Sequence, residues 1–554
     1  MIRFYKKSIF SFTVFFLFSM IPLFSISYYA DSAEVVELEY LYRKNGSLFP
    51  ITSYPVSGAA LIDSARALRD KIGETDAGVL ALVIDRLKEA EKPPRIRTQI
   101  ATNLQYRAFV NPQRAETGDA HSTASALDFQ RFFLSKPALV VLDLSAQSEQ
   151  GFFLSVLGDF MSQWDGDLFN SENIPMFGAA GSESSFENHF VTRGNLIWSK
   201  GVLTAAFGRD TMRLGPRRGS SLYPSDKLPF MDAARLTVPF GAVTMDWYIS
   251  SLHPVAASGH DVEPNLTNSG TVDPAGPFGF EDDTNQTDIW YTAHRFEMNL
   301  GRVSAAIGGQ VLMARRNNHI QLTDFIPGIA LHNADVRPNN MSILLQLRAL
   351  PVNGLELSLD AGYDDINANA VGIGDYSIPT IDAYIGRAVY DVGVPWGRVS
   401  LFAEVGTTHY LWGNFDAAAT GIESEYVDTL ARAIYRYRID GDWGAALLPL
   451  TSPFGPGVRW LTLEAGAAVG CLKLRVNYQL LSINTLANLI DTPYREDAAV
   501  ENAPRVLYHD IGFAASYDLN PVSFTFAPSL LIRDGAVGFE CSFIFSARYA
   551  ARFL

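Results

Sequence analysis

The sequence predicts an all-β protein: an antiparallel transmembrane β-barrel of about 18 strands with a small N-terminal periplasmic helical domain. One observation is the C-terminal hairpin, where residues 522–533 and 537–553 alternate apolar and polar side chains around an Asp534-Gly535 turn. The second is a regular alternation of short and long connections along the chain from Arg95 onward. Outer-membrane barrels have short periplasmic turns and long extracellular loops, so both patterns favour such a barrel over a soluble sandwich.

The chain begins with the features of a secretory signal. Three basic residues precede the apolar segment 8–26, and the small residues Ala30 and Ala33 follow it. We predict a signal peptide over residues 1–30, cleaved near Ala30. The alternative is a retained transmembrane anchor, because the apolar segment is close to the ~20 residues that span a bilayer.

Composition narrows the class of protein. Hydrophobic residues make up 48% of the 554-residue chain and are spread in short alternating runs, which favours a membrane barrel over a bundle of spanning helices. The net charge of −15 argues against a nucleic-acid partner. The two cysteines, Cys471 and Cys541, lie in separate predicted strands and are too few for a disulfide framework or a cysteine-based metal cluster. No cofactor or metal is therefore expected.

Residues 31–94 do not follow the barrel pattern. The segment 35–43 fits one short strand, Ser57 can cap a helix, and a second helix is predicted after Gly73 and ends at a Pro-Pro pair. We expect this helical domain to lie in the periplasm, because the termini of such barrels lie there.

Residues 95–554 are predicted to form the barrel. Within them, the segment 412–458 is the hardest to assign, since residues 427–437 fit a strand, a helix or a loop equally well. Five tryptophans near predicted strand ends are interpreted as an interfacial girdle, with a sugar-stacking platform as the alternative. These residues are Trp198, Trp247, Trp290, Trp412 and Trp460. The eight predicted long connections are 111–124, 163–189, 210–231, 252–287, 316–340, 364–380, 412–458 and 484–506.

The most distinctive segment, residues 207–232, falls in a long-loop position and is rich in Gly and Pro. It is a local cluster of positive charge in an acidic protein, and arginine forks suit bidentate contacts to carboxylates, including those of acidic sugars. The candidate ligand-binding residues are Arg209, Arg213, Arg217, Arg218, Tyr223 and Asp226, with Tyr223 stacking on a sugar face. The alternative is a structural loop whose Arg–Asp pairs attach it to the barrel wall.

The same segment contains a recognisable series of short motifs: Gly208-Arg209, Gly215-Pro216, Gly219, Ser225-Asp226 and Pro229-Phe230. It resembles the signature of the Wzi family of outer-membrane capsule assembly proteins. The N-terminal residues Asn45-Gly46, Pro50-Ile51 and Tyr54-Pro55, which precede the first predicted helix, are similar to that family's entry into its periplasmic helical bundle. The chain departs from the pattern at its last residue, Leu554, where an aromatic residue is expected.

The resemblance implies an 18-stranded barrel with a lectin-like, non-catalytic role. Its expected partners are surface or capsular polysaccharide and the lipid of the outer membrane, and the protein is expected to be a monomer. The alternative is a porin or substrate channel lined by Glu404, Lys473, Arg475 and Arg548. An enzyme is disfavoured, because the chain has no HExxH or G-x-S-x-G motif.

The acidic segment 281–288 fits Ca²⁺ only weakly, because its spacing is not that of an EF-hand.

Overall fold

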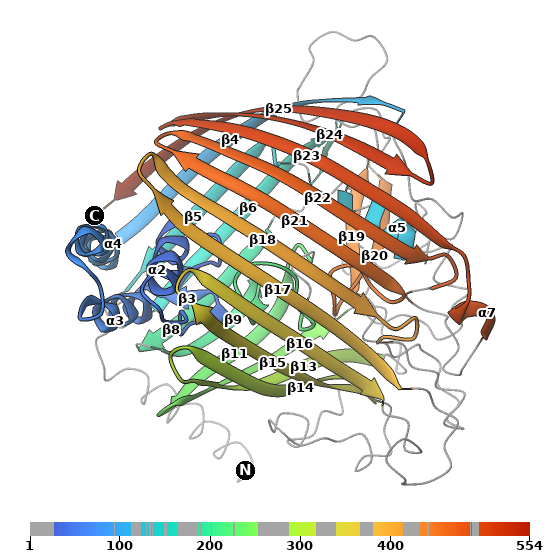
Figure 1. The fold of residues 1–554 in the computed structure, drawn as a ribbon, viewed down its shortest axis with the longest axis horizontal. Helices are drawn as coiled ribbons and strands as arrows, with labels where there is room; N and C mark the ends of the chain where they lie inside the picture. Colours follow the sequence, from blue (N-terminus) through green and yellow to red (C-terminus); the bar gives the residue numbers. More distant parts are fainter. Residues whose placement is uncertain are drawn as a thin grey trace, which may run out of the picture.

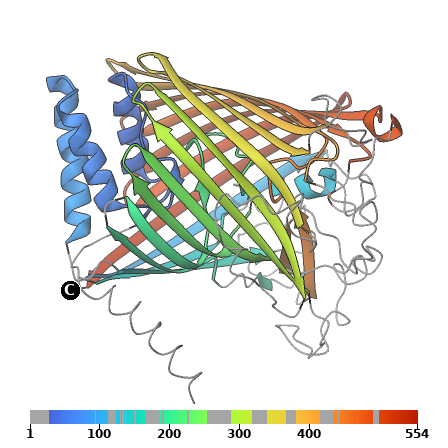
Figure 2. The same ribbon diagram turned by 90° about the horizontal axis from the view of Figure 1, so that it is seen from below.

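In the computed structural model, the chain forms a β-barrel with its N-terminal helices gathered at one end (Figures 1 and 2). The structure describes residues 27–553 except for 93–94, 112–122, 129, 132–134, 136, 149–151, 164–184, 188–190, 201, 225–227, 253–286, 317–338, 366–379, 414–432, 440–441, 488 and 490–497. Among these residues no helix is long and apolar enough to cross a membrane.

Within the described residues, eighteen antiparallel strands close into a ring, which confirms the predicted fold class. They are β4 (Arg95–Val110), β5 (Val140–Gln147), β6 (Phe152–Gln163), β8 (Arg193–Lys200), β9 (Leu203–Asp210), β11 (Met231–Phe240), β12 (Val243–Leu252), β13 (Thr287–Asn299), β14 (Val303–Arg316), β15 (Asn339–Val352), β16 (Leu355–Asp365), β17 (Ile381–Val394), β18 (Gly397–Thr408), β21 (Val458–Val469), β22 (Leu472–Asn484), β23 (Arg505–Leu519), β24 (Val522–Arg533) and β25 (Ala536–Phe553). Strand β25 pairs with β4 and closes the ring. The short strand β7 (Ser185–Glu187) adds to β6 without interrupting the pairing of β6 with β8.

The two faces of the wall differ in chemistry. On β15, Ile343, Leu345 and Leu347 are exposed on the outside, whereas Gln346 and Arg348 point inward and are buried. Successive side chains of a strand point to opposite faces, so this alternation makes the outer surface apolar and the inner surface polar. Such a wall suits lipid outside and polar contents inside.

The two ends of the barrel also differ. Helices α2 (Ala33–Lys44), α3 (Gly58–Arg69) and α4 (Glu74–Glu91) lie at the end that we call the helical end, together with the C-terminus (Figures 1 and 2). The tight turn between β21 and β22 lies there too, while the strands that border the long connections have those ends at the opposite side, which we call the far end. At the far end β24 and β25 are joined by the predicted Asp534-Gly535 turn.

The helical end corrects one prediction and confirms two. The predicted strand over 35–43 is wrong, because those residues belong to helix α2. Val35, Leu38 and Leu41 recur at helical spacing and are buried. Burial of this apolar face of the helix outweighs the local preference for a strand. Helix α3 begins as predicted, with the Ser57 side chain accepting a hydrogen bond from Ala60 N at 3.1 Å, and α4 follows Gly73.

Connections at the far end pack back into the barrel. The first one runs from 111 to 139 rather than ending at 124, and it contains helix α5 (Thr123–Asp128). The unassigned segment 412–458 contains a two-stranded hairpin, β19 (Ala433–Ile439) and β20 (Asp442–Leu448). One apolar core inside the barrel joins parts of both segments to the wall.

The tryptophans divide into two groups. Trp412 and Trp460 belong to that internal core and are fully buried, so their assignment to an interfacial girdle is wrong. Trp198, Trp247 and Trp290 lie on the outward face of their strands and are partly exposed, as a girdle requires.

Candidate functional site

The distinctive segment of the sequence leaves the wall and runs through the inside of the barrel. Strands β9 and β11 pair up to Asp210 and Met231, and between these residues the chain enters the lumen. We call residues 211–230 the inner segment. Near its start, β10 (Arg213–Leu214) pairs with β2 (Ser53–Tyr54) from the helical end, and Gly215 N donates to Thr52 O at 2.8 Å. The inner segment therefore reaches the base of the helical domain.

A buried ion-pair cluster joins the inner segment to the helices and the wall. Glu39 of α2 accepts a hydrogen bond from Arg217 of the inner segment, and it pairs with Arg43 at 3.0 Å. Arg43 in turn pairs with Glu356 of β16 at 3.4 Å and with Asp391 of β17. Three carboxylates and two arginines thus hold the inner segment, helix α2 and the wall together.

The charge of Glu39 is set by these partners. Burial alone would raise its pKa, but the guanidinium groups of Arg217 and Arg43 outweigh the burial and lower the pKa to about 2. Glu39 is therefore ionised at neutral pH although it is only 3% exposed. A buried carboxylate in this state depends on its cationic partners, since an unpaired buried charge is costly.

A second cluster fixes the middle of the inner segment to strands β17 and β18. Ser220 donates two hydrogen bonds to Glu404, from its backbone N at 2.7 Å and from its Oγ at 2.6 Å. Arg387 donates to Ser220 O and pairs with Asp360 at 2.8 Å. Trp460 Nε1 also donates to Glu404, at 2.8 Å. Wall and inner segment therefore share one hydrogen-bond network.

Further buried pairs continue along the same wall. Arg295 lies between Asp246 at 3.3 Å and Glu297 at 2.9 Å. Arg348 pairs with Glu356 at 2.9 Å. These charges line the inner face of β12 to β16 and compensate one another, so this side of the lumen is filled by paired groups.

The structure disperses the five predicted ligand-binding residues that it describes. Arg209 lies on the outer face of β9, pairs with Asp232 at 2.7 Å and stacks over Phe230. Arg213 donates to the carbonyls of Pro216 and Gly219 and so shapes the turn of the inner segment. These contacts match the alternative of a structural loop attached to the wall.

The remaining predicted residues lie mostly inside. Arg217 pairs with Glu39, and Arg218 pairs with Glu464 of β21 at 2.8 Å. Tyr223 is 1% exposed, and its hydroxyl donates to His294 O at 3.5 Å. Asp226 and the acidic residues 281–286 lie outside the described residues. Whether any of these residues contacts a glycan remains a prediction.

Sequence reasoning missed the residues that organise this interior. Glu39 was hidden in a segment interpreted as a strand, and Glu404 entered only as a lining residue of a channel. A signal was present in the acidic and basic residues at inward positions of neighbouring strands, such as Asp360, Arg387 and Glu404. In the part of the chain that the structure describes, no group of His, Cys, Asp and Glu side chains is arranged to hold a metal ion.

The opposite side of the lumen is lined by exposed polar groups. Lys473 and Arg475 of β22 and Arg548 of β25 point inward and are exposed, and Lys473 pairs with Asp518 at 2.8 Å. The inner segment thus packs against β17 and β18 and leaves charged side chains of β22 and β25 accessible to solvent.

Comparison with solved structures places this architecture among outer-membrane barrels. Wzi from Escherichia coli, described as involved in group 1 capsule assembly and as a carbohydrate-binding β-barrel, superposes with a TM-score of 0.52 at 12% identity, covering 94% of this chain and 98% of Wzi. The chain has a Wzi-like barrel fold. Two Pseudomonas aeruginosa proteins, OccK5 (OpdH) and OprD, match with TM-scores of 0.39 and 0.38 at 10% identity, each over 83% of this chain and over 98% and 96% of theirs. No family model and no curated protein matches the sequence.

Proposed function

We propose that this protein holds surface or capsular polysaccharide at the outer membrane without catalysing a reaction. In this proposal the helical end faces the periplasm and the far end faces the cell exterior. The Wzi-like fold supports it, because Wzi is described as a carbohydrate-binding barrel involved in capsule assembly. The likeness to the motifs of residues 207–232 supports it independently.

The observation that carries the proposal is the filled side of the lumen. The inner segment is tied to the helices through Arg217 and Glu39 and to the wall through Ser220 and Glu404. A barrel built to pass solutes has little use for a segment held by buried ion pairs, since each pair requires desolvation of two charges. We infer a scaffold that presents a surface rather than a pathway.

The proposed roles of the five sequence-derived residues that the structure describes are refined accordingly. Arg213, Arg217, Arg218 and Tyr223 are proposed to act by holding the inner segment in place, which positions the strands and connections around it. Arg209 stays a candidate for direct contact, because its side chain is 35% exposed beside Asp232. Direct glycan contacts are otherwise proposed for the far-end connections.

The test is the partition of polysaccharide between cells and medium in a strain that lacks the protein. We expect glycan that is still synthesised but is shed into the medium, with retention restored by the wild-type gene. Unchanged cell-bound glycan, with the protein's absence verified, would contradict the proposal.

A substrate channel is the second candidate, favoured by the exposed inward cations Lys473, Arg475 and Arg548. Such groups would attract anions into a water-filled path along β22 and β25. Planar-bilayer recordings on the purified barrel separate the candidates. A closed wild-type barrel supports the polysaccharide-holding role, and a steady anion-selective conductance supports the channel.

A further inference from the structure

The outer face of the barrel carries two neighbouring arginines at the far end. Arg459 lies on β21 and Arg505 on β23, and both alternate with inward residues of the internal core, Val458 and Val506. Strand β22 separates them, and its Ser482 is the register partner of Arg459. Both guanidinium groups thus belong to the outward surface at the rim of the apolar wall.

Arg505 is held in a fixed position. Its Nε donates to Ser482 Oγ at 2.8 Å, and its Nη2 donates to Ser482 O at 2.7 Å and to Gly457 O at 2.8 Å. Its side chain therefore reaches across β22 toward the start of β21. Because Ser482 is also the register partner of Arg459, the two arginines occupy neighbouring positions on the outer surface.

No acid compensates this pair among the residues that the structure describes. Arg459 is exposed and forms no hydrogen bond or ion pair with any of them, and every contact of Arg505 is to a neutral oxygen. The nearby Asp534 instead accepts a hydrogen bond from Leu507 N at 3.1 Å. Two adjacent cations at an outer rim form a site of positive potential that suits a phosphate.

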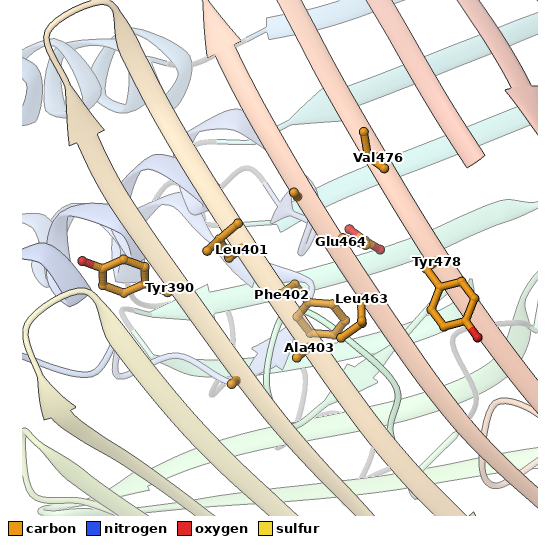
Figure 3. Close-up of a pocket in the computed structure, with 10 residues that line it drawn as sticks. Tyr390, Leu401, Phe402, Ala403, Leu463, Glu464, Val476 and Tyr478 are labelled. Atoms are coloured by element: carbon orange, nitrogen blue, oxygen red, sulfur yellow. The ribbon is translucent and has the colours of Figure 1, made fainter. Parts of the chain in front are cut away.

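On the helical-end side of the arginines, the wall carries an apolar groove of about 380 Å³. The groove extends across β17, β18, β21 and β22 (Figure 3). Small side chains, Ala388, Ala403 and Ala465, alternate there with larger ones such as Leu401 and Leu463. Arg459 and Leu463 are four residues apart on one strand, which is about 13 Å at the usual rise. The groove therefore begins within the length of an acyl chain from the arginines.

We propose that this surface binds one phosphorylated lipid, with its phosphate on Arg459 and Arg505 and an acyl chain in the groove. The assignment of this lipid to the outer leaflet rests on the proposed orientation of the barrel; the binding itself does not. Phosphate accounts for the uncompensated charge, and an acyl chain accounts for the apolar groove that begins about 13 Å away along the same strand. A soluble anion would use only the first of these features.

The experiment uses the full-length mature protein, purified and stripped of lipid in detergent. An acylated glycolipid that carries two phosphates is titrated in and counted by native mass spectrometry. We expect one tightly held lipid in the wild type and roughly tenfold weaker binding in Arg459→Ser, the loss expected for one charge-assisted contact. Arg459→Lys should retain most of the affinity.

Three comparisons decide the proposal. Lys200→Ser removes an exposed cation from the outer face at the helical end and should bind like the wild type. The same glycolipid without its phosphates should bind as weakly to the wild type as the phosphorylated lipid binds to Arg459→Ser. Millimolar inorganic phosphate should not displace the bound lipid.

Equal binding by wild type and Arg459→Ser, or by lipids with and without phosphate, would overturn the proposal. Displacement by inorganic phosphate would also overturn it, because an ion site alone would remain. Arg505→Lys keeps the charge but loses the fork, so it provides a second variant if Arg459→Ser does not yield a folded barrel. This experiment measures lipid binding and not glycan retention. A negative result would therefore overturn the lipid site and leave the proposed function untouched, because glycan partition tests that function separately.

Discussion

At the scale of single residues, the inside of this barrel is governed by charge pairing. Glu39 pairs with Arg43 of its own helix and with Arg217 of the inner segment, and Glu404 accepts from Ser220 and Trp460. An intact buried ion pair contributes little net free energy to stability, because desolvation of the two charges offsets their attraction. Removing one partner is costly, because it leaves the other charge buried and unpaired. Single substitutions should therefore have large and local effects.

Replacing Glu39 by Gln should loosen the helical end. The change leaves Arg43 and Arg217 with one fewer acid, and breaking such a buried pair costs about 3–5 kcal/mol. We expect faster hydrogen exchange in α2 and in the inner segment, measured by mass spectrometry, with the strands β22 to β25 unchanged. The matched control is Asp63→Asn, which breaks the exposed pair of Asp63 with Arg66 and should have almost no effect.

The contact made by Glu39 should also depend on pH. Its pKa in the folded protein is about 2, lowered from 4.5 because Arg217 and Arg43 outweigh the effect of burial. A lowered pKa means that the stabilisation is complete above pH 4.5 and is lost as the pH falls toward 2, with a size on the order of 3 kcal/mol. Hydrogen exchange of α2 should accelerate over that range in the wild type. A Glu39→Gln variant that shows the same acceleration would rule out this residue as its source.

Gly219 should resist substitution because of where the inner segment turns. Its φ of +87° lies in the left-handed region, and a Cβ there would come within 2.9 Å of Arg387 Cδ. Gly219→Ala should destabilise the inner segment by about 1–3 kcal/mol, from backbone strain and overpacking. Gly241→Ala, at a φ of +64° with nothing within 4 Å, is the control for backbone strain alone. Equal losses in melting temperature for both variants would exclude a packing contribution.

At the scale of elements, the helical end is built from strands and helices that contact the barrel directly. Helix α2 meets the turns of the wall, where Gly354 N donates to Arg43 O at 2.8 Å. Strand β1 (Ser27–Tyr28) pairs with β3 (Val56–Ser57). Tyr28, which pairs with Val56 and is buried, is therefore part of the packed structure.

The packing of the first described residues predicts where the signal peptide is cleaved. Tyr28 is buried, and the Tyr29 hydroxyl donates to Asp210 Oδ2 at 3.0 Å, so cleavage near Ala30 would remove two packed tyrosines. We expect cleavage after Ser27, where Ser25 and Ser27 supply small residues at the required spacing. Intact-mass measurement of the mature protein should give a chain that begins at Tyr28. A chain that begins at Asp31 would contradict this and support the position favoured by the sequence alone.

At the scale of the whole molecule, the lumen has two unlike sides. One side is filled by the inner segment, and the other exposes Arg475 and Arg548. The position of the inner segment should therefore decide how much of the lumen is open to solvent.

Deleting residues 212–229, with a Gly-Ser linker in their place, should open the barrel. The wall pairs β9 with β11 without these residues, so the ring should still close. We expect a steady conductance in planar bilayers where the wild type is closed, together with retained heat-modifiable migration on gels. A deletion variant that stays closed would show that other parts of the chain block the lumen.

The sequence alone determined the closed antiparallel barrel, its number of strands and its alternation of short and long connections. These features follow from local physics: a strand with lipid on one side must alternate, and a tight turn needs residues such as Asp534-Gly535. Helix α3 was predictable for the same reason, since the Ser57 cap acts over three residues. The hairpin β19–β20 and helix α2 were not, because their local patterns fit more than one conformation.

Only the tertiary structure decided what the arginine-rich segment does. From the sequence its arginines form one cluster, whereas in the fold Arg209 lies outside the barrel and Arg217 lies inside against Glu39. Likewise Trp412 and Trp460 are tryptophans near strand ends, as expected for an interfacial girdle, but they lie in the internal core. The physical reason is common to these cases. A side chain's partner is chosen by desolvation and charge at its final position, and that position depends on residues distant in the sequence.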